Sequence, residues 1–319
     1  RAVQAALVFG DPLLSARAER ARAQHLRGLA DLAAAELAYQ RALAHLTPPR
    51  PASAHARASL LLDAGSLAAD AQQSQLALRR YREALRAFQT CEDTDRVTRA
   101  ELHMAMLLSE RGRLDEAERA SQRALSRLRE AGDRGGQGVV LCHLTLVALE
   151  RGALEPAEER LAEAQRLNRE VGARRFEAYG QLLAAMLAQA RGELGMAEGL
   201  ADTSIDIFEE VGDARFAALA RARRGLLRAL RGATARSHLD LRDAHRALSE
   251  TNNPHLLAGV EAMFGLLALC EGDRDAAERA VDRYLEIFGD RYYIELQYNG
   301  IQEQLDASLG GGPEALGQR

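Results

Sequence analysis

Apolar residues in the segment 154–171 recur at spacings of three and four. This spacing places four of them on one stripe of a helix: Leu154, Ala157, Leu161 and Ala164. Charged residues such as Glu158 lie on the opposite face. The preceding segment, 134–151, is apolar nearly all round, which indicates a helix packed between neighbours. The pattern therefore predicts a hairpin of one inner, mostly buried helix and one outer, amphipathic helix.

The same pattern returns every forty residues. The phrase RGRLDEAERA at 111–120 has counterparts at 151–160, 191–200, 231–240 and 271–280. Five glycines keep this register: Gly112, Gly152, Gly192, Gly232 and Gly272. A second series lies midway between them, at Gly132, Gly172 and Gly212, followed by Asn252. Because glycine readily ends a helix with a positive φ, we predict a stacked array of helical hairpins joined by short turns.

Small residues mark the places where helices approach each other closely. One set falls five residues after the glycines, at Ala117, Ala157, Ala197 and Ala277. A second set falls seven residues before them, at Ala105, Thr145, Ala185, Gly225 and Gly265. Small side chains let two helix axes come toward the short end of the usual range of about 8–10 Å. We therefore expect Ala157→Leu to cost about 1–3 kcal/mol through overpacking.

These residues resemble the tetratricopeptide repeat, in which a small residue precedes the phrase Gly-x-Leu-x-x-Ala and another alanine follows. The residues that carry the likeness in one repeat are Ala105, Gly112, Leu114, Ala117 and Ala124. The forty-residue length is similar to the long variant found in bacterial regulators of the maltose-activator and STAND ATPase type. The resemblance covers about residues 12–288 and implies an all-α, right-handed superhelical solenoid of about seven antiparallel hairpins.

Two hairpins are expected before the regular repeats, because YQRAL at 39–43 and YREAL at 81–85 echo the later outer helices. The first pairs helices at about 12–27 and 31–46, and the second spans 53–90. The proline cluster at 47–53 predicts a stiff connector between them, since proline disrupts a helix interior.

The chain thus divides into a predicted solenoid and its flanks. Residues 1–10 are interpreted as a linker or the tail of a preceding domain, and 11–289 as the solenoid. Residues 290–308 are expected to form a C-terminal capping helix, because a solenoid must cover its last apolar face. Residues 309–319 are predicted to be a disordered tail. The chain begins at Arg1 without a methionine, so we expect a piece of a longer protein.

Composition narrows the possible functions. The net charge is −4 and every one of the 42 basic residues is arginine. This mildly acidic balance argues against a nucleic-acid surface. Cys91, Cys142 and Cys270 form no CxxC pair, which argues against a disulfide framework or zinc site and favours a reduced, cytoplasmic setting. The longest uncharged run, 135–149, is too short for a membrane span.

Few residues suggest chemistry. The run DRGGQG at 133–138 lacks the Gly-Lys-Ser/Thr of a phosphate loop. His103 and His143 lie forty residues apart and are interpreted as hydrogen-bonded inner-helix histidines, with a pH- or ligand-sensing pair as the alternative. The repeated glutamates, Glu118, Glu158, Glu198 and Glu278, are expected on a solvated face near arginines. The arginines Arg111, Arg151, Arg191 and Arg231 are interpreted as local charge balance, with a rail for an acidic partner as the alternative. We expect no catalytic residues, no metal and no cofactor.

The resemblance implies that ligands are held in the concave groove lined by the first helix of each repeat. The groove residues so assigned are Leu102, Met106, Cys142, Leu146, Leu182, Met186, Leu226 and Leu266, with Ala222 and Ala262 at equivalent places. They are overwhelmingly apolar, which favours an amphipathic helix or hydrophobic segment as the partner. A tight superhelix that buries these residues against one another is an equal alternative.

The sequence therefore predicts a non-enzymatic protein-interaction or sensor module, the regulatory arm of a larger bacterial signalling protein. Its partners would be a protein or peptide and flanking domains of the same polypeptide, without nucleic acid or membrane. The rival is a small-molecule or peptide-pheromone receptor whose groove closes on its ligand. A pocket with convergent arginines would favour this rival, and a continuous apolar groove would favour the first function.

Overall fold

The computed structural model describes residues 11–288 except 30, 49 and 251–253. Within these ranges the chain forms α-helices, one short 3₁₀ helix and no strand. The α-helices are α2 (Pro12–Gly28), α3 (Leu32–His45), α4 (Ala54–Asp70), α5 (Ser74–Thr90), α6 (Thr94–Glu110), α7 (Leu114–Glu130), α8 (Arg134–Glu150), α9 (Leu154–Glu170), α10 (Arg174–Ala190), α11 (Leu194–Glu210), α12 (Ala214–Leu230), α13 (Thr234–Ser249), α14 (Pro254–Glu271) and α15 (Arg274–Phe288). The all-α array of adjacent helical hairpins predicted from the sequence is confirmed.

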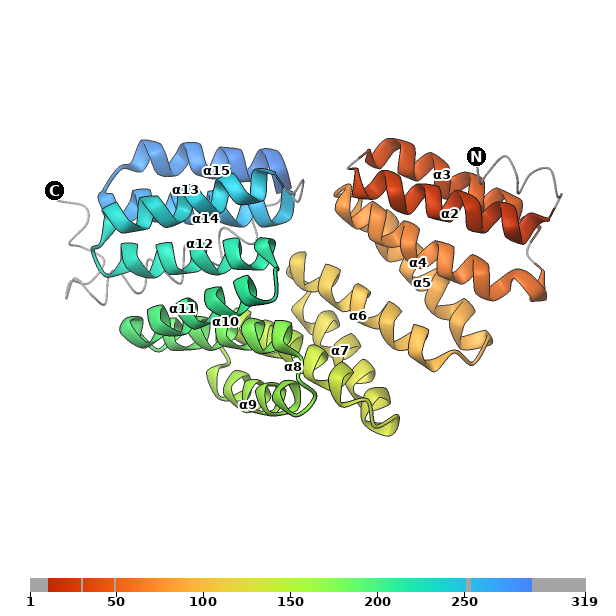
Figure 1. Ribbon diagram of the computed structural model, residues 1–319, viewed down its shortest axis with the longest axis horizontal. Coiled ribbons are helices and arrows are strands. Elements are labelled where there is room, and N and C mark those ends of the chain that lie inside the picture. The colour runs from red at the N-terminus through yellow and green to blue at the C-terminus, as the bar shows by residue number, and fades with distance from the viewer. Residues whose placement is uncertain (1–10, 30, 49, 251–253, 289–319) are drawn as a thin grey trace. The chain divides into compact units, whose positions relative to one another are not determined.

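The helices fall into two compact units. Unit 1 comprises Arg1–Ser109 and Asp115–Arg127, and unit 2 comprises Glu110–Leu114 and Leu128–Arg319. Each unit is described by itself. Within unit 1, α2 packs on α3 and α4 on α5, and within unit 2 the pairs are α8 with α9, α10 with α11, α12 with α13 and α14 with α15. Figure 1 shows the partners of these hairpins lying side by side. The prediction of one solenoid domain over 11–289 stays a prediction.

The turns explain why consecutive helices fold back so sharply. At the end of α8, Gly152 has a φ of 70°, and its N–H donates to the Leu149 carbonyl oxygen at 3.0 Å. The N–H of Ala153 donates to the Ala148 carbonyl oxygen at 2.9 Å. These two bonds form a Schellman-type cap, which satisfies the last carbonyls of the helix and leaves three residues between helices. A positive φ recurs at seven other glycines: Gly112, Gly132, Gly172, Gly192, Gly212, Gly232 and Gly272.

The same turn occurs in unit 1 without glycine. Gln72 has a φ of 61° and Glu92 a φ of 54°, both in the left-handed region. Gln73 and Asp93, the residues that follow them, donate from their N–H groups to carbonyl oxygens five residues earlier, as Ala153 does. The twenty-residue spacing of turns thus begins at position 72, ahead of the first glycine of the series.

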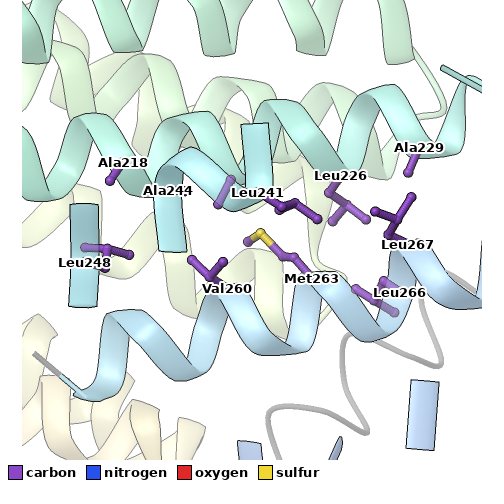
Figure 2. Close-up of a cluster of buried hydrophobic side chains, with 11 residues drawn as sticks. Ala218, Leu226, Ala229, Leu241, Ala244, Leu248, Val260, Met263, Leu266 and Leu267 are labelled. Carbon is purple, nitrogen blue, oxygen red and sulfur yellow. The ribbon is translucent and has the colours of Figure 1, made fainter. Parts of the chain in front are cut away.

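The core lies between the helices of successive hairpins. Every alanine predicted to mark a close approach and described here is buried, and Ala157 has no exposed surface. In unit 2, larger side chains fill the space where α12, α13 and α14 meet. Figure 2 shows Leu226 of α12, Leu241 and Leu248 of α13 and Met263 of α14 converging on this cluster. The outer helices present one apolar stripe to this core and a charged face to solvent, as their sequence pattern predicts.

Among the described residues of the proline segment 47–53, none is α-helical, and Pro51–Ser53 form a 3₁₀ turn. Three predicted segments lie outside the described residues: the linker at 1–10, the capping helix at 290–308 and the tail at 309–319.

Candidate functional site

The residues assigned to the groove fall into two groups by exposure. Leu146 of α8 and Met186 of α10 are half-buried in unit 2. In unit 1, Leu102 of α6 is half-buried and Met106 is 47% exposed. These four side chains present apolar surface on first helices of their hairpins.

The other assigned residues are buried in helix packing. Leu182 is 3% exposed, and Leu226 and Leu266 have no exposed surface because they belong to the core between α12, α13 and α14 (Figure 2). Cys142 is 1% exposed, and its Sγ lies 3.7 Å from Nδ2 of Asn168. Burial raises the pKa of the Cys142 thiol to about 12, so this thiol stays protonated and unreactive. A partner reaches none of these four side chains without rearrangement of the helices.

A second row of half-buried apolar residues accompanies Leu146 and Met186. Val139 of α8, Tyr179 of α10 and Leu219 of α12 lie forty residues apart. Val139 and Tyr179 each precede their assigned neighbour by seven residues, which is about two helical turns and therefore the same face. We call these five side chains the inner row of unit 2. The sequence carried a signal for it, because an apolar residue recurs at positions 139, 179 and 219.

Unit 1 contains a pocket of about 210 Å³ between α2, α4 and the start of α6. Three arginines line it: Arg17 and Arg20 from α2, and Arg96 from α6. The remaining lining residues are His55 and Ser59 of α4 and the apolar side chains Leu13, Ala16, Ala56 and Leu60. Sequence analysis did not find this pocket.

Two aspartates hold the basic side chains of the pocket in place. Nε of Arg20 donates to Asp63 at 2.7 Å, while Nε2 of His55 lies 2.7 Å from Oδ2 of Asp93. Nε of Arg96 lies 3.3 Å from the same Asp93 oxygen, and its Nη1 donates to Ser59 Oγ at 2.9 Å. Although burial opposes ionisation of Asp93, hydrogen bonds from His55 and the Arg96 backbone hold the pKa of its carboxyl below the ordinary value.

The outer-helix glutamates pair with arginines of the following repeat. Glu158 of α9 accepts from Nη2 of Arg191 at 2.6 Å, and this hydrogen bond lowers the pKa of the exposed Glu158 carboxyl. Glu198 of α11 accepts from Nε of Arg228 at 2.9 Å and also pairs with Arg231. These contacts agree with the interpretation of local charge balance, and a more exposed pair such as Glu158–Arg191 stabilises little.

The two histidines lie in different units and have different surroundings. In unit 1, His103 stacks on the ring of Tyr81, with centroids 5.6 Å apart, and burial followed by the charges of Arg99 and Arg27 lowers its pKa. In unit 2, His143 is buried, and burial lowers its pKa to about 4. Both imidazoles are therefore neutral at pH 7.

Among the described residues, no cluster of three or more histidine, cysteine or acidic side chains could hold a metal ion. None of the helices in the described ranges is long and apolar enough to cross a membrane.

Comparison with known proteins identifies a family of repeats in part of the chain. Residues 96–170 match the family model described as tetratricopeptide repeat. No curated protein sequence gives a significant match.

Solved structures share the fold. One is the Rap conjugation gene regulator of plasmid pLS20 in complex with the Phr* peptide, with 19% identity, a TM-score of 0.66, and coverage of 92% of this chain and 77% of that chain. Another is aspartyl phosphate phosphatase F from Bacillus subtilis, with 14% identity, a TM-score of 0.68, and coverage of 88% and 72%. A third is a STAND protein with a tetratricopeptide repeat sensor from Pyrococcus horikoshii, with 15% identity, a TM-score of 0.57, and coverage of 89% and 43%. At these identities the likeness establishes the fold.

Proposed function

Because this chain carries tetratricopeptide repeats, we propose that it is a non-enzymatic module that binds a protein or peptide segment. The observation that carries the proposal is the inner row of unit 2, in which five apolar side chains remain partly open on three successive first helices. A soluble helix that buries its whole apolar face has no such residues, so partly open apolar side chains in register indicate a contact surface. The peptide in the complex of the Rap relative supports this function.

We propose one partner surface in each unit: Leu146 and Met186 in unit 2 and, separately, Leu102 and Met106 in unit 1. An amphipathic helix or a hydrophobic segment fits these side chains, because each offers apolar area without a hydrogen-bonding group. Cys142 and Leu182 would support the surface of unit 2, since they are buried within the same helices as Leu146 and Met186, whereas Leu226 and Leu266 belong to the core between α12, α13 and α14.

The larger context is also part of the proposal. The STAND relative is longer than this chain, which covers 43% of it, and its tetratricopeptide repeats serve as a sensor. By analogy, the module would be the regulatory arm of a larger bacterial signalling protein in the cytoplasm and would report occupancy of its surface to flanking domains.

Affinity capture from a lysate of the source organism tests the surface. We compare the native chain with Met106→Glu, Met186→Glu and the matched control Met196→Glu. Met196 lies on the outer helix α11 and is 59% exposed. Each variant is first checked for native helicity and cooperative unfolding. The proposal predicts a protein that the native chain and Met196→Glu retain and that folded Met186→Glu loses. Retention by all variants would contradict the assigned surface.

A receptor for a small molecule or peptide pheromone is the second candidate, and the arginine-lined pocket of unit 1 favours it. A receptor that closes on its ligand must slow hydrogen exchange in first helices outside the pocket as well as around it. Protection confined to α2 and α4 upon addition of ligand would contradict such closure.

A further inference from the structure

Unit 2 contains a pocket between α13, α14 and α15, and α14 packs against both of the other helices (Figure 1). We call it the outer pocket, because α13 and α15 are outer helices of their hairpins. Its volume of about 630 Å³ is within the range of about 300–1,000 Å³ for small-molecule sites. The side chains used below are Arg242, His245 and Arg246 of α13, Glu261 and Phe264 of α14, and Arg283 of α15.

A buried carboxylate holds two side chains of the outer pocket in place. Glu261 is 5% exposed. Its Oε1 lies 3.0 Å from Nε2 of His245, and its Oε2 accepts a hydrogen bond from Nε of Arg283 at 2.7 Å. Because the three groups come from three helices, this carboxylate links α13 and α15 through α14. Both of its oxygens are thereby occupied, and Arg283 compensates its charge.

The outer pocket also holds hydrogen-bond donors that the fold leaves unused. Arg242 has no hydrogen-bond or ion-pair partner among the described residues. Arg246 pairs only with Asp243, at 3.5 Å, and both side chains of this pair are largely exposed. The two Nη nitrogens of Arg283 have no partner in the described part of the chain. Guanidinium groups bind phosphate through paired N–H donors, and here such donors come from both α13 and α15.

This set of side chains departs from the repeat pattern. The positions of the earlier outer helices that correspond to His245 carry no histidine: they are Leu85, Leu125, Gln165 and Ile205. In α11, Asp202 and Asp206 stand where α13 has Arg242 and Arg246, so the charge is reversed. A residue that serves repeat packing recurs from hairpin to hairpin, whereas a local departure from the pattern is expected at functional sites.

The charge of the outer pocket selects the charge of the ligand. Its three arginines carry three positive charges, and Glu250 and Glu261 carry two negative ones. One net positive charge is left when His245 is neutral, and two when it is protonated. A phosphate monoester, with about −1.5 to −2 at pH 7, matches this range.

Phe264 selects the rest of the ligand. This side chain is half-buried, and its ring centroid lies 6.2 Å from that of His245, with an angle of 67° between the ring planes. Aromatic groups of ligands stack on such rings, and guanidinium groups stack on aromatic faces as well. The outer pocket therefore suits a ligand in which an aromatic ring accompanies the phosphate.

We infer that the outer pocket is a binding site for a small aromatic phosphate, with Arg242, Arg246 and Arg283 binding the phosphate and Phe264 the ring. Two sources share this chemistry: a free nucleoside monophosphate and the phosphotyrosine side chain of a protein. The inference does not rest on the function proposed above, because no residue of the outer pocket belongs to the inner row of unit 2.

Ligand-observed ¹H NMR titration of the full chain at pH 7 and low salt tests the site. The probe is phenyl phosphate, and benzyl alcohol is its counterpart without the charged group. We expect saturable binding of phenyl phosphate and about tenfold weaker binding of benzyl alcohol, since charge-assisted hydrogen bonds contribute about this factor or more. No binding of phenyl phosphate at about 10 mM, or equal binding of the two probes, overturns the inference.

Matched variants locate the phosphate. Arg242→Gln removes one charge and breaks no contact within the described residues, so the fold should be retained. We expect it to weaken binding of phenyl phosphate about tenfold. Arg236→Gln, on the same helix but outside the pocket, is the control and should leave the affinity unchanged. Equal effects of the two substitutions overturn the assignment.

Phe264→Leu tests the ring, because it keeps an apolar side chain and removes the aromatic face. Once native helicity is verified, we expect about fivefold weaker binding of phenyl phosphate, since aromatic stacking contributes about this factor or more. Inorganic phosphate, measured as a competitor of phenyl phosphate, should keep its own affinity in this variant. An equal loss for both ligands, or no loss for either, overturns the role of Phe264.

Adenosine monophosphate and N-acetyl-O-phospho-L-tyrosinamide distinguish the two sources. Tighter binding of the nucleotide, by about fivefold or more, identifies a free nucleotide as the ligand, and the reverse order identifies a phosphotyrosine side chain. Equal affinities show that the ring and the phosphate alone are recognised, as the inference states. Weaker binding of both compounds than of inorganic phosphate overturns it.

Discussion

Arg224 of α12 and Asp240 of α13 form a two-pronged ion pair across one hairpin. Nε of Arg224 donates to Oδ2 of Asp240 at 3.0 Å, and its Nη2 donates to Oδ1 at 2.6 Å. Nη1 of Arg228 donates to the same carboxylate at 2.7 Å. Asp240 is 5% exposed, and its hydrogen bonds raise the pKa of Arg224 above the ordinary value. This carboxylate therefore accepts hydrogen bonds from two arginines that are largely shielded from water.

Asp240→Asn should destabilise unit 2 by about 2–4 kcal/mol, because it removes the buried carboxylate that Arg224 and Arg228 share. Asp202→Asn is the matched control, since the more exposed Asp202 contacts the same Arg224 at 2.7 Å. We expect the control to cost less than about 1 kcal/mol. Urea unfolding followed by circular dichroism measures both changes. Equal losses for the two variants would show that burial of the pair does not matter.

Arg223, unlike Arg224, is a buried arginine without a carboxylate partner among the described residues. It is 5% exposed, and its Nη1 lies 3.3 Å from Oε1 of Gln189. Met263 occupies the equivalent place forty residues later and is also buried. Arg223→Met should therefore stabilise the fold by about 1–3 kcal/mol in urea unfolding. The exposed Arg215→Met is the control and should change stability by less than about 0.5 kcal/mol. A loss of stability in Arg223→Met would contradict the claim that the buried charge of Arg223 destabilises the fold.

His143 should make stability depend on pH. Burial lowers its pKa in the folded state to about 4, below the unfolded value of about 6.5. As the pH falls, the unfolded chain therefore takes up the proton before the folded chain does. The contribution of neutral His143 to the free energy of unfolding is complete above about pH 6.5 and is lost as the pH falls toward 4.

Comparison with His143→Leu isolates this effect, because Leu183 fills the equivalent place in α10. Between pH 7 and pH 5, the native chain should lose about 2 kcal/mol more free energy of unfolding than the variant. Identical losses would contradict the neutral buried imidazole.

Gly65 of α4 permits close contact with α5. A Cβ at this position would lie 2.6 Å from Cδ1 and Cε1 of the buried Tyr81 ring. Gly65→Ala should cost about 1–2 kcal/mol, because overpacking outweighs the better helix propensity of alanine. Gly199→Ala meets no atom within 4 Å, so it should gain about 0.5–1 kcal/mol. Thermal unfolding shows whether each variant is more or less stable than the native chain. An increase in stability in both variants would show that Tyr81 moves aside freely.

The repeating turns could be predicted wherever glycine occupied them. At Gln72 and Glu92 the same left-handed turn is made without glycine, so the sequence showed no signal there. The N–H groups of Gln73 and Asp93, which donate to carbonyl oxygens five residues earlier, close these turns. The small residues at helix crossings were equally predictable, because small side chains recur there in register.

The candidate sites were less predictable. Periodicity placed Leu146 and Leu226 at equivalent positions, yet the first is half-buried and the second is fully buried. Bulky neighbours such as Leu241 and Met263 enclose Leu226, and a repeat alignment does not report such local packing. The arginine-lined pocket was missed for a different reason. Its residues come from helices starting at Pro12, Ala54 and Thr94. The first of these helices starts 42 residues before the second and is therefore out of step with the forty-residue period.

Hydrogen exchange of the full chain with and without a captured partner segment tests the central claim most directly. The account predicts slower exchange in α8, α10 and α12 around Leu146 and Met186, little change in the outer helices α9, α11 and α13, and loss of the protection in folded Met186→Glu. Protection confined to the outer helices, or protection unchanged by Met186→Glu, would contradict a partner surface on the inner row of unit 2.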